Sequence, residues 1–353
     1  MRYRPFGSSG LRVSEAALGT GTFGTRWGSG AEKPVAKQIF DAYVAAGGNF
    51  FDCASAYQAG QAEEFLGEFI RAERESFAIS TKYTTASEKA SILNTGNSRK
   101  TMLQSLDGSL KRLGTDYVDL FWVHYADYVT PVDEIMKAFD DVVRAGKARY
   151  VGFSDFPAWR VARAATVAEL RGWSPVSAVQ LEYSLAERSA ERELIPMASA
   201  FGLAVVVWSA LGGGLLTGKY RRGESGRRET GSGAGQFKTL SQDQEDRILQ
   251  AVEEVAAALG ATFAQVAIAW VRAQTEAWGV SFLPIIGART IDQLADNLGA
   301  LDVTLSADQL SRLNEASAVP MGFPHDFIQG KGLLNAQSGG MWDRLDRPSR
   351  HIR

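Results

Sequence analysis

The stretch DAYVAAGGNFFDCASAY (residues 41–57) contains the unit that is repeated along the chain and decides its fold. An amphipathic segment stops at Gly47, a short apolar run follows it, and this run ends on Asp52 before a loop. Glycine is common just past the end of a helix, and a short apolar run between turn residues is typical of a buried strand. The stretch therefore predicts a helix, a tight turn and a buried strand.

The same alternation recurs from residue 16 to residue 298. Strands are expected at residues 16–18, 49–52, 77–81, 117–123, 148–153, 178–181, 204–207 and 282–285. Helices are expected at residues 34–46, 62–71, 99–113, 131–145, 157–170 and 190–201, as a pair across 242–274, and at 291–298. Such alternation gives parallel strands joined by right-handed crossovers. Eight units without a change of composition predict an α/β fold, a single (β/α)8 TIM barrel, rather than two domains.

Three segments lie outside this repeat. Residues 1–14 hold two short extended runs on either side of a glycine turn, which predicts a β-hairpin ahead of the first barrel strand. Residues 221–239 are rich in Gly, Ser and Arg, and we expect a mobile loop there. Residues 320–353 show no clear periodicity and form a C-terminal tail without an assigned role. Residues 1–353 are thus expected to form one barrel domain with a hairpin and a tail.

The composition excludes several classes of protein. Lys and Arg number 38 against 40 Asp and Glu, so the net charge of −2 offers no positive excess for nucleic acid. No apolar segment approaches the roughly 20 residues of a membrane helix, and the N-terminus lacks the apolar run of a signal peptide. Cys53 is the only cysteine, which excludes an intrachain disulfide and a cysteine-rich zinc site. We expect a soluble, cytoplasmic protein, and its oligomeric state stays open.

Two glycine-rich stretches imitate phosphate-binding motifs. GTGTFG (residues 19–24) matches the dinucleotide fingerprint, which works only when its glycines open directly into a helix. No helix is expected before residue 34, so a doubly wound fold with Asp52 as its ribose-binding acid is only a rival. GGLLTGKY (residues 213–220) has Tyr220 where a phosphate loop needs a small hydroxyl for magnesium. A nucleotide triphosphatase is therefore excluded. The glycines and the lysine of this stretch still suit the binding of some phosphate group.

Polar side chains gather where the expected strands end. Asp52 ends the second strand, Lys82 follows the third, His124 follows the fourth, and Tyr57 lies in the loop after the second. Singly, each has a plainer explanation: a capping aspartate, a surface lysine or tyrosine, and a structural histidine. Together they lie on the carboxyl-terminal face of a barrel, where the active sites of this architecture are built.

These four residue types suit the reduction of a carbonyl group. A phenol has a pKa of about 10, so Tyr57 alone is a reluctant proton donor at neutral pH. The ammonium of Lys82 is expected to lower the pKa of Tyr57, and Asp52 is expected to hold Lys82 in place and charged. A neutral His124 is expected to orient the carbonyl oxygen. No cluster of ligands suggests a metal.

These segments resemble the aldo-keto reductase superfamily, closest to its bacterial and potassium-channel β-subunit-like branch. The resemblance is carried by NFFDCASAY (49–57), STKY (80–83), DLFWVH (119–124), RYVGFSD (149–155), QLEYS (180–184), WSALGGGLLTGKY (208–220) and IIGARTIDQLADNLGAL (285–301). It spans about residues 1–315, and the ordered spacing of the motifs makes it specific. In that family the N-terminal hairpin plugs the bottom of the barrel.

The resemblance implies a catalytic tetrad and a site for NADP(H). The tetrad would be Asp52, Tyr57, Lys82 and His124, with Tyr57 as the general acid. The implied cofactor contacts are Gly21, Thr22, Asp52, Ser154, Gln180, Trp208, Ser209, Ala210, Leu211, Gly213, Lys219, Gly287, Arg289, Gln293 and Asn297. Ser154 and Gln180 would bind the nicotinamide carboxamide, and Trp208 would stack on the nicotinamide ring.

The remaining implied contacts hold the phosphates and the adenosine. Backbone amides around residues 210–213, with Lys219, would hold the pyrophosphate. Arg289 would read the adenosine 2′-phosphate, because a guanidinium beside a helix N-terminus favours a dianion and hence NADP(H) over NAD(H). Gln293 and Asn297 lie four residues apart on one helix face and would contact the adenosine.

One residue departs from the family, and the substrate is open. Asp155 stands where the family commonly has Asn, and an ionised carboxylate accepts hydrogen bonds but donates none. Trp27, Tyr125 and Phe156 are expected near the carboxyl-terminal face as an apolar wall, or as loop packing. We expect an NADP(H)-dependent oxidoreductase that reduces a small aldehyde or ketone. The alternatives are a non-catalytic cofactor sensor, like the potassium-channel β-subunits, and an NAD-dependent sugar or alcohol dehydrogenase.

Overall fold

Eight parallel strands close into a barrel in the computed structural model, which describes residues 1–87, 89–220, 223 and 240–346. The strands, in the order in which they pair around the barrel, are β10 (Phe282–Gly287), β3 (Ala17–Gly19), β4 (Phe50–Asp52), β5 (Ala78–Tyr83), β6 (Val118–Val123), β7 (Ala148–Ser154), β8 (Val176–Glu182) and β9 (Ala204–Trp208). All eight expected strands are present, with ends shifted by one or two residues. The barrel prediction is confirmed, and the doubly wound rival is wrong.

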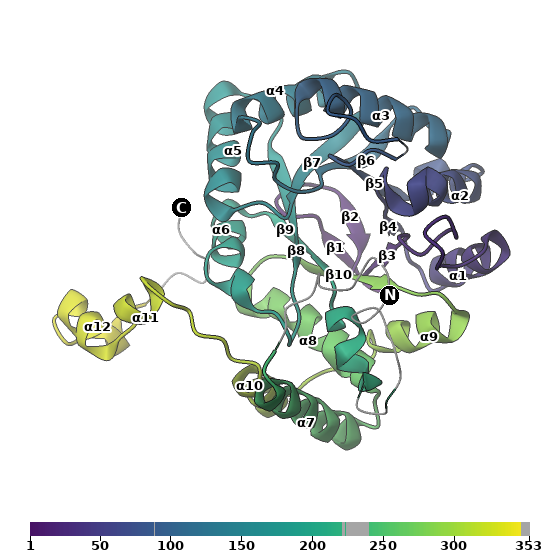
Figure 1. Ribbon diagram of the computed structural model, residues 1–353. Coiled ribbons are helices and arrows are strands. Elements are labelled where there is room, and N and C mark those ends of the chain that lie inside the picture. Colours follow the sequence, from purple (N-terminus) through teal and green to yellow (C-terminus); the bar gives the residue numbers. More distant parts are fainter. Residues whose placement is uncertain (88, 221–222, 224–239, 347–353) are drawn as a thin grey trace.

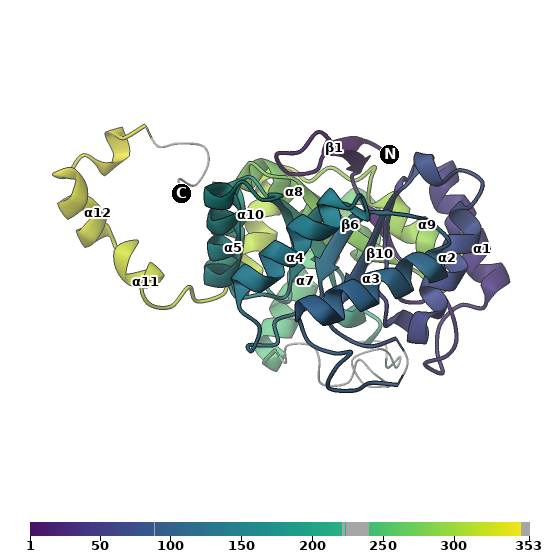
Figure 2. The same ribbon diagram turned by 90° about the horizontal axis from the view of Figure 1, so that it is seen from above.

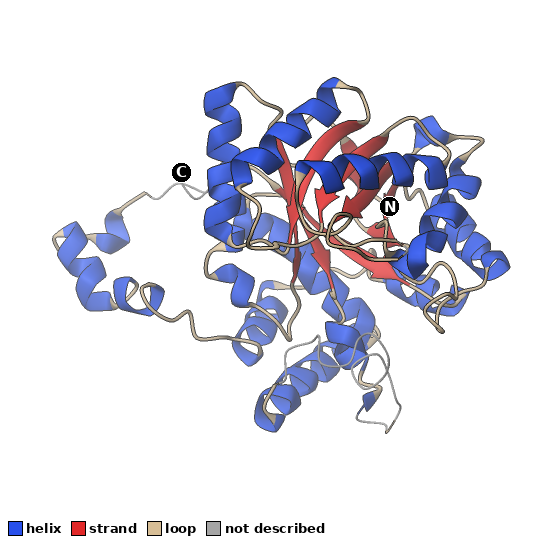
Figure 3. Ribbon diagram, turned by 45° about the horizontal axis from the view of Figure 1, so that its top comes forward, coloured by secondary structure: helices blue, strands red, loops and turns tan. Residues whose placement is uncertain are grey.

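Helices surround the barrel on its outside (Figures 1 and 3). They are α1 (Lys33–Ala45), α2 (Gln61–Ile70), α3 (Arg99–Leu113), α4 (Val132–Arg144), α5 (Ala158–Arg171), α6 (Leu194–Phe201), α7 (Gln242–Leu259), α8 (Phe263–Trp278) and α9 (Ile291–Gly299). Among the described residues, no single helix is long and apolar enough to cross a membrane. The pair α7 and α8, bent by 97°, passes that test only when the two are taken together.

The N-terminal hairpin closes one end of the barrel. Strands β1 (Tyr3–Pro5) and β2 (Arg12–Ser14) pair antiparallel, as predicted. Phe6 and Val13 are fully buried and pack with side chains of the barrel interior, among them Phe50 and Trp122. The hairpin therefore fills the end that lies opposite the carboxyl ends of the strands.

The structure adds helices that the sequence pattern did not predict. Helix α10 (Ala307–Ala316) follows α9, and α11 (His325–Ile328) and α12 (Lys331–Ser338) lie in the tail. Ser306 and Gln309 form a capping box at the start of α10, which is a signal that the sequence does contain. Figure 2 shows α11 and α12 standing away from the barrel. The expected loop at 221–239 lies outside the described residues except for Gly223.

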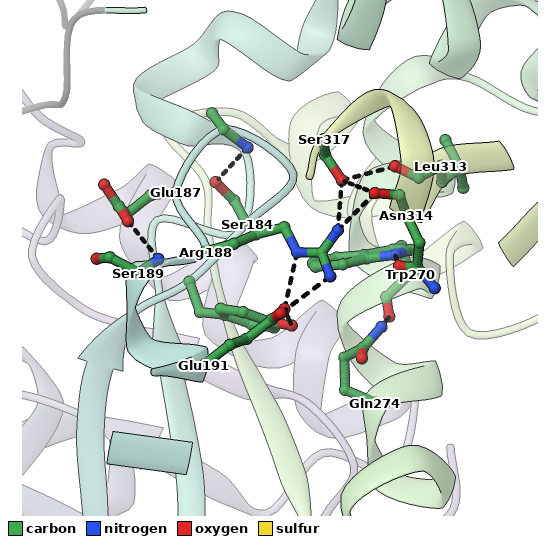
Figure 4. Close-up of polar contacts among 12 residues, drawn as sticks. Ser184, Glu187, Arg188, Ser189, Glu191, Trp270, Gln274, Leu313, Asn314 and Ser317 are labelled. Carbon is green, nitrogen blue, oxygen red and sulfur yellow. Dashed lines mark hydrogen bonds and ion pairs between the residues drawn. The ribbon is translucent and has the colours of Figure 1, made fainter. Parts of the chain in front are cut away.

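A partly buried arginine ties the loop after β8 to α8 and α10 (Figure 4). Arg188 donates from Nε and Nη2 to the two carboxylate oxygens of Glu191 at 2.7 and 3.0 Å. Its Nη1 donates to the carbonyl oxygen of Asn314 at 2.8 Å and to Oγ of Ser317 at 2.9 Å. The guanidinium also lies over the ring of Trp270, 5.3 Å from its centre. One side chain thus joins three elements that are far apart in sequence.

We expect Arg188→Met to lower the free energy of unfolding by about 2–3 kcal/mol, because it leaves the partly buried carboxylate of Glu191 without its counter-charge. The matched control is Arg163→Met, which removes an exposed ion pair with Asp133 and should cost less than about 1 kcal/mol. Urea unfolding of both variants measures the difference. Equal losses would show that burial does not strengthen the Arg188 contacts.

Candidate active site

The structure brings the four residues of the expected tetrad together at the carboxyl ends of neighbouring strands. Asp52 is the last residue of β4, Lys82 lies in β5, and His124 directly follows β6. Tyr57 opens the short 3-10 helix Tyr57–Gly60 in the loop after β4. The carboxyl ends of parallel strands meet at one face, so three consecutive strand-helix units converge on one place. Their catalytic roles stay predictions at this point.

Lys82 is the centre of this group. Its side chain is fully buried, and the Nζ atom donates to Oδ2 of Asp52 at 2.6 Å, to the carbonyl oxygen of Cys53 at 2.8 Å and to Oη of Tyr57 at 3.2 Å. An ammonium has three N–H donors, and each of them has a partner here. Burial alone lowers the pKa of Lys82, but the charge of Asp52 raises it, and the net shift is upward. Lys82 is therefore held as a cation.

The acidity of Tyr57 differs from the expectation. Burial is the largest influence and raises the pKa of the Tyr57 hydroxyl, and the nearby charge of Lys82 only partly offsets it. The net shift is upward, so the prediction of a lowered pKa is wrong. The sequence showed the ammonium of Lys82 but not the loss of solvent around the phenol. Tyr57 is consequently a protonated group at neutral pH.

His124 is neutral, as expected from its place in the sequence. Burial and the positive charge of Lys82 lower the pKa of His124 to about 3. Its ring lies edge-on to the ring of Tyr57, with the two centres 5.9 Å apart. A neutral imidazole beside a phenol offers a hydrogen-bonding nitrogen without adding a charge to the site.

The second oxygen of Asp52 carries contacts that the sequence did not predict. Oδ1 accepts from Oγ of Ser80 and from Nε2 of Gln180, both at 2.9 Å. Gln180 lies in β8, so its amide crosses the barrel interior to reach β4. The side-chain nitrogen of Gln180 is thus engaged by Asp52. A contact between Gln180 and the nicotinamide carboxamide would therefore use the side-chain oxygen of Gln180.

The ends of β7 and β9 are also connected. Trp208 donates from Nε1 to Oδ1 of Asp155 at 3.0 Å, and Ser154 donates from Oγ to Oδ2 of the same carboxylate at 3.3 Å. Burial raises the pKa of Asp155 to about 6, although these two hydrogen bonds oppose the shift. The departure from the family pattern at Asp155 is thus part of this site.

A compact glycine turn follows β9. Ser209 and Gly213 have positive φ values of 60° and 65°, and a side chain at Gly214 would meet Lys219, because an added Cβ would lie 2.8 Å from its Cε atom. The amides of Gly212 and Gly213 donate to the carbonyl oxygen and to Oγ of Ser209 at 2.7 and 3.2 Å. The amides of Gly212 and Gly213 therefore donate within the turn. They were expected to be among the amides at residues 210–213 that bind the pyrophosphate. The close packing against Lys219 still fits a phosphate group.

The loop between β10 and α9 is held by the two residues expected at the adenosine. Gln293 accepts from the backbone N–H of Arg289 at 2.9 Å, and Asn297, which is buried, donates to the carbonyl oxygen of Gly287 at 3.1 Å. The side chain of Arg289 is exposed, and the Cα of Gly287 faces open space. Gln293 and Asn297 therefore shape this loop and are not simply solvated.

Residues 21 and 22 connect this loop to the tetrad. Thr22 donates from Oγ1 to the carbonyl oxygen of Ala288 at 2.7 Å. An added Cβ on Gly21 would lie 3.7 Å from the ring of Tyr57. The loop after β3 therefore contacts both the loop after β10 and the phenol.

Two of the three aromatic residues expected at the mouth border the tetrad. The ring of Trp27 lies edge-on to Tyr57 at 6.1 Å, and the ring of Tyr125 lies 5.5 Å from that of His124. Both side chains are partly exposed to solvent, at 45% and 43%. Phe156 follows the other alternative, loop packing.

Phe156 belongs to the protein interior. It is buried, packs on Phe153 with ring centres 4.9 Å apart, and lies beneath the guanidinium of Arg160.

Among the residues that the structure describes, no group of three or more His, Cys, Asp or Glu side chains is placed to hold a metal ion.

Comparisons with known proteins agree on one family. The model of the Aldo/keto reductase family matches residues 16–318. The chain is 34% identical over 337 residues to an aryl-alcohol dehydrogenase, NADP(+), of Phanerodontia chrysosporium, with 90% of this chain and 86% of the relative covered. It is 32% identical over 331 residues to a norsolorinic acid reductase of Aspergillus flavus (91% and 82% covered). It is 37% identical over 333 residues to the uncharacterized oxidoreductase YrpG of Bacillus subtilis (91% and 98% covered).

We expect Lys82→Met to lower the free energy of unfolding by about 3–5 kcal/mol, because Asp52 then stays buried without its counter-charge. The double variant Asp52→Asn, Lys82→Met should recover much of that loss, since both charges are removed. Urea unfolding measures both. Lys147→Met, which breaks an exposed ion pair with Asp107, is the control and should cost less than about 1 kcal/mol. A double variant no more stable than Lys82→Met would contradict the explanation.

Proposed function

Because this chain belongs to the aldo/keto reductase family, and is thus an oxidoreductase, we propose that it reduces an aldehyde or ketone to the alcohol with NADP(H). In this proposal Tyr57 gives the proton to the carbonyl oxygen. The observation that supports it is the contact of 3.2 Å between Nζ of Lys82 and Oη of Tyr57, with Asp52 directly behind Lys82. A protonated phenol beside a held ammonium is what proton donation to a carbonyl oxygen requires.

The side chains of the tetrad divide the work. A bound NADPH supplies the hydride that is added to the carbonyl carbon. The Oη proton of Tyr57 moves to the carbonyl oxygen, and the ammonium of Lys82 stabilises the phenolate that remains. Asp52 keeps that ammonium charged and in place. The imidazole of His124, being neutral, hydrogen-bonds the carbonyl oxygen and orients it without competing for the proton.

The raised pKa of Tyr57 is compatible with this role. A weak acid keeps its proton until a strong base forms, and the carbonyl oxygen becomes strongly basic only as hydride arrives. At that moment the charge of Lys82, in a site with little water, lowers the energy of the phenolate. The interaction is thus stronger in the transition state than in the ground state, which is the condition for raising kcat.

The cofactor would lie across the later strands. Trp208 would stack on the nicotinamide, Ser154 and the side-chain oxygen of Gln180 would bind its carboxamide, and Lys219 would hold the pyrophosphate. The backbone amides of Ala210 and Leu211 would bind the pyrophosphate together with Lys219. The amides of Gly212 and Gly213 instead donate within the turn. The glycine turn packed on Lys219 and the open space at Gly287 fit this group.

NADP(H) is proposed over NAD(H) for two reasons. Arg289 is exposed just before the N-terminus of α9, where a guanidinium and the helix dipole together favour a phosphate dianion. The name of one relative also states NADP(+). Gln293 fixes the backbone at Arg289 and so helps to present the guanidinium.

The substrate is proposed to be an aromatic carbonyl compound. Trp27 and Tyr125 flank the tetrad with partly exposed rings, and flat aromatic groups pack favourably against such rings. By name, two relatives act on an aryl alcohol and on norsolorinic acid. A panel of aryl aldehydes, aliphatic aldehydes, ketones and sugars, followed by NADPH absorbance, tests the proposal. Tight NADPH binding without turnover of any compound would favour a cofactor sensor instead.

We expect Tyr57→Phe to bind NADPH with an unchanged Kd but to lose carbonyl reduction by about 10²–10⁴-fold, because the ring stays and only the proton donor is removed. Calorimetric titration with NADPH and steady-state kinetics with an active aldehyde measure the two effects. Unchanged turnover would exclude Tyr57 as the acid.

The pH dependence provides a second check on the same residue. Tyr57 stays protonated at neutral pH, so reduction should not depend on its ionisation between about pH 7 and 9. Oxidation of the alcohol needs the phenolate, so its rate should rise by about tenfold per pH unit below the pKa of Tyr57. The residual oxidation by Tyr57→Phe should lack this rise.

We expect Arg289→Ala to raise the Kd for NADPH by at least about tenfold and to leave the Kd for NADH nearly unchanged, since only NADPH has the 2′-phosphate. Arg171→Ala, at an exposed arginine at the end of α5, is the control and should change neither constant. Equal weakening of both cofactors would remove the proposed role of Arg289.

A further inference from the structure

We propose that Asp155 is a positioning residue whose carboxylate fixes the plane of the Trp208 indole for the nicotinamide, rather than a direct contact of the cofactor. The inference rests on the proposed function, because it assumes that Trp208 stacks on the nicotinamide. It assigns a role to the one site residue that departs from the family pattern.

The contact itself is well formed. The indole nitrogen of Trp208 donates to Oδ1 of Asp155 at 3.0 Å, and a hydrogen bond to an ionised carboxylate is stronger than one between neutral groups. Asp155 follows β7 and Trp208 ends β9, with β8 between them in the barrel. The carboxylate therefore reaches past the end of β8 to hold a ring on the strand beyond it.

Asp155 is rigidly placed for this purpose. Its backbone N–H donates to the carbonyl oxygen of Gln180 at 3.0 Å, and its own carbonyl oxygen accepts from the N–H of Ala126 at 3.4 Å. Its φ of +48° lies in the left-handed region, which aspartate tolerates better than most residues. Ser154 donates to the other carboxylate oxygen, Oδ2, at 3.3 Å. Contacts with β8, with the loop after β6 and with Ser154 thus fix the acceptor.

The contacts favour this role over two others. An aspartate shortly before a helix often caps it, but the N-cap of α5 is Pro157 and no side chain caps that helix end. A direct carboxamide contact would have to share oxygens that already accept from Trp208 and Ser154. The hydrogen bond that Oδ1 accepts comes from the indole N–H of Trp208.

The consequence concerns the orientation of the ring. The backbone of Trp208 is fixed by pairing in β9 and by the N–H of Tyr183, which donates to its carbonyl oxygen at 3.3 Å. These backbone contacts do not fix the side-chain torsions of Trp208. The hydrogen bond from Nε1 to Asp155 fixes the plane of the indole before the cofactor binds, and such preorganisation reduces the entropic cost of binding.

A double-mutant cycle with NADPH tests the inference. Calorimetry should give a Kd about five- to tenfold higher for Asp155→Ala, the loss of one hydrogen bond, and a Kd close to that of the unchanged protein for Asp155→Asn, which keeps an acceptor oxygen. Trp208→Phe keeps a ring but has no N–H. Adding Asp155→Ala to Trp208→Phe should therefore change the Kd no further. Independent, additive effects of the two substitutions would overturn the proposal.

A second readout needs no cofactor and so separates this inference from the proposed function. In the free protein, exchange of the Trp208 indole proton with solvent, followed by NMR and assigned with Trp208→Phe, should be slow in the unchanged protein and in Asp155→Asn. It should be faster in Asp155→Ala. Trp159→Phe, at an exposed indole, is the control and should alter neither readout. Equal exchange in Asp155→Ala and the unchanged protein would overturn the inference, whereas absent NADPH binding with the expected exchange would contradict only the proposed function.

Discussion

The ion pair between Lys82 and Asp52 is the constraint on which the whole site depends. The two side chains are 0% and 2% exposed and lie 2.6 Å apart, and neither charge is stable in that interior without the other. The pair joins β4 and β5, where Asp52 stands opposite Ser80, so the barrel register itself brings the two groups together. Tyr57, His124 and Gln180 all take their electrostatic surroundings from this pair.

Much of this arrangement is readable from the sequence because the barrel has a simple repeat. Parallel strands covered on both faces appear as short apolar runs, and their carboxyl ends converge, so Asp52, Lys82 and His124 could be expected at one place. The hairpin was recognisable from its glycine turn. Helix α10 gives no clear apolar period because its surface is mostly polar, although its capping box is present at Ser306 and Gln309.

The remaining features depend on distances that no pattern encodes. The sequence shows a cation near Tyr57 but not how much water is excluded there, which decides the direction of its pKa shift. The contact of Gln180 with Asp52 spans 128 residues, and that of Trp208 with Asp155 spans 53. Each contact depends on how the strands are placed around the barrel.

The N-terminal hairpin also has a consequence for how the chain folds as it is made. Oγ of Ser281 donates to the carbonyl oxygen of Pro5 at 2.8 Å across 276 residues, and β3 pairs with β10 to close the barrel. Such long-range contacts carry a large loop-closure entropy and form slowly. Synthesis runs from the N-terminus, so the hairpin leaves the ribosome long before its partners exist. The hairpin residues are made well before β10 and are among the last to reach their final contacts.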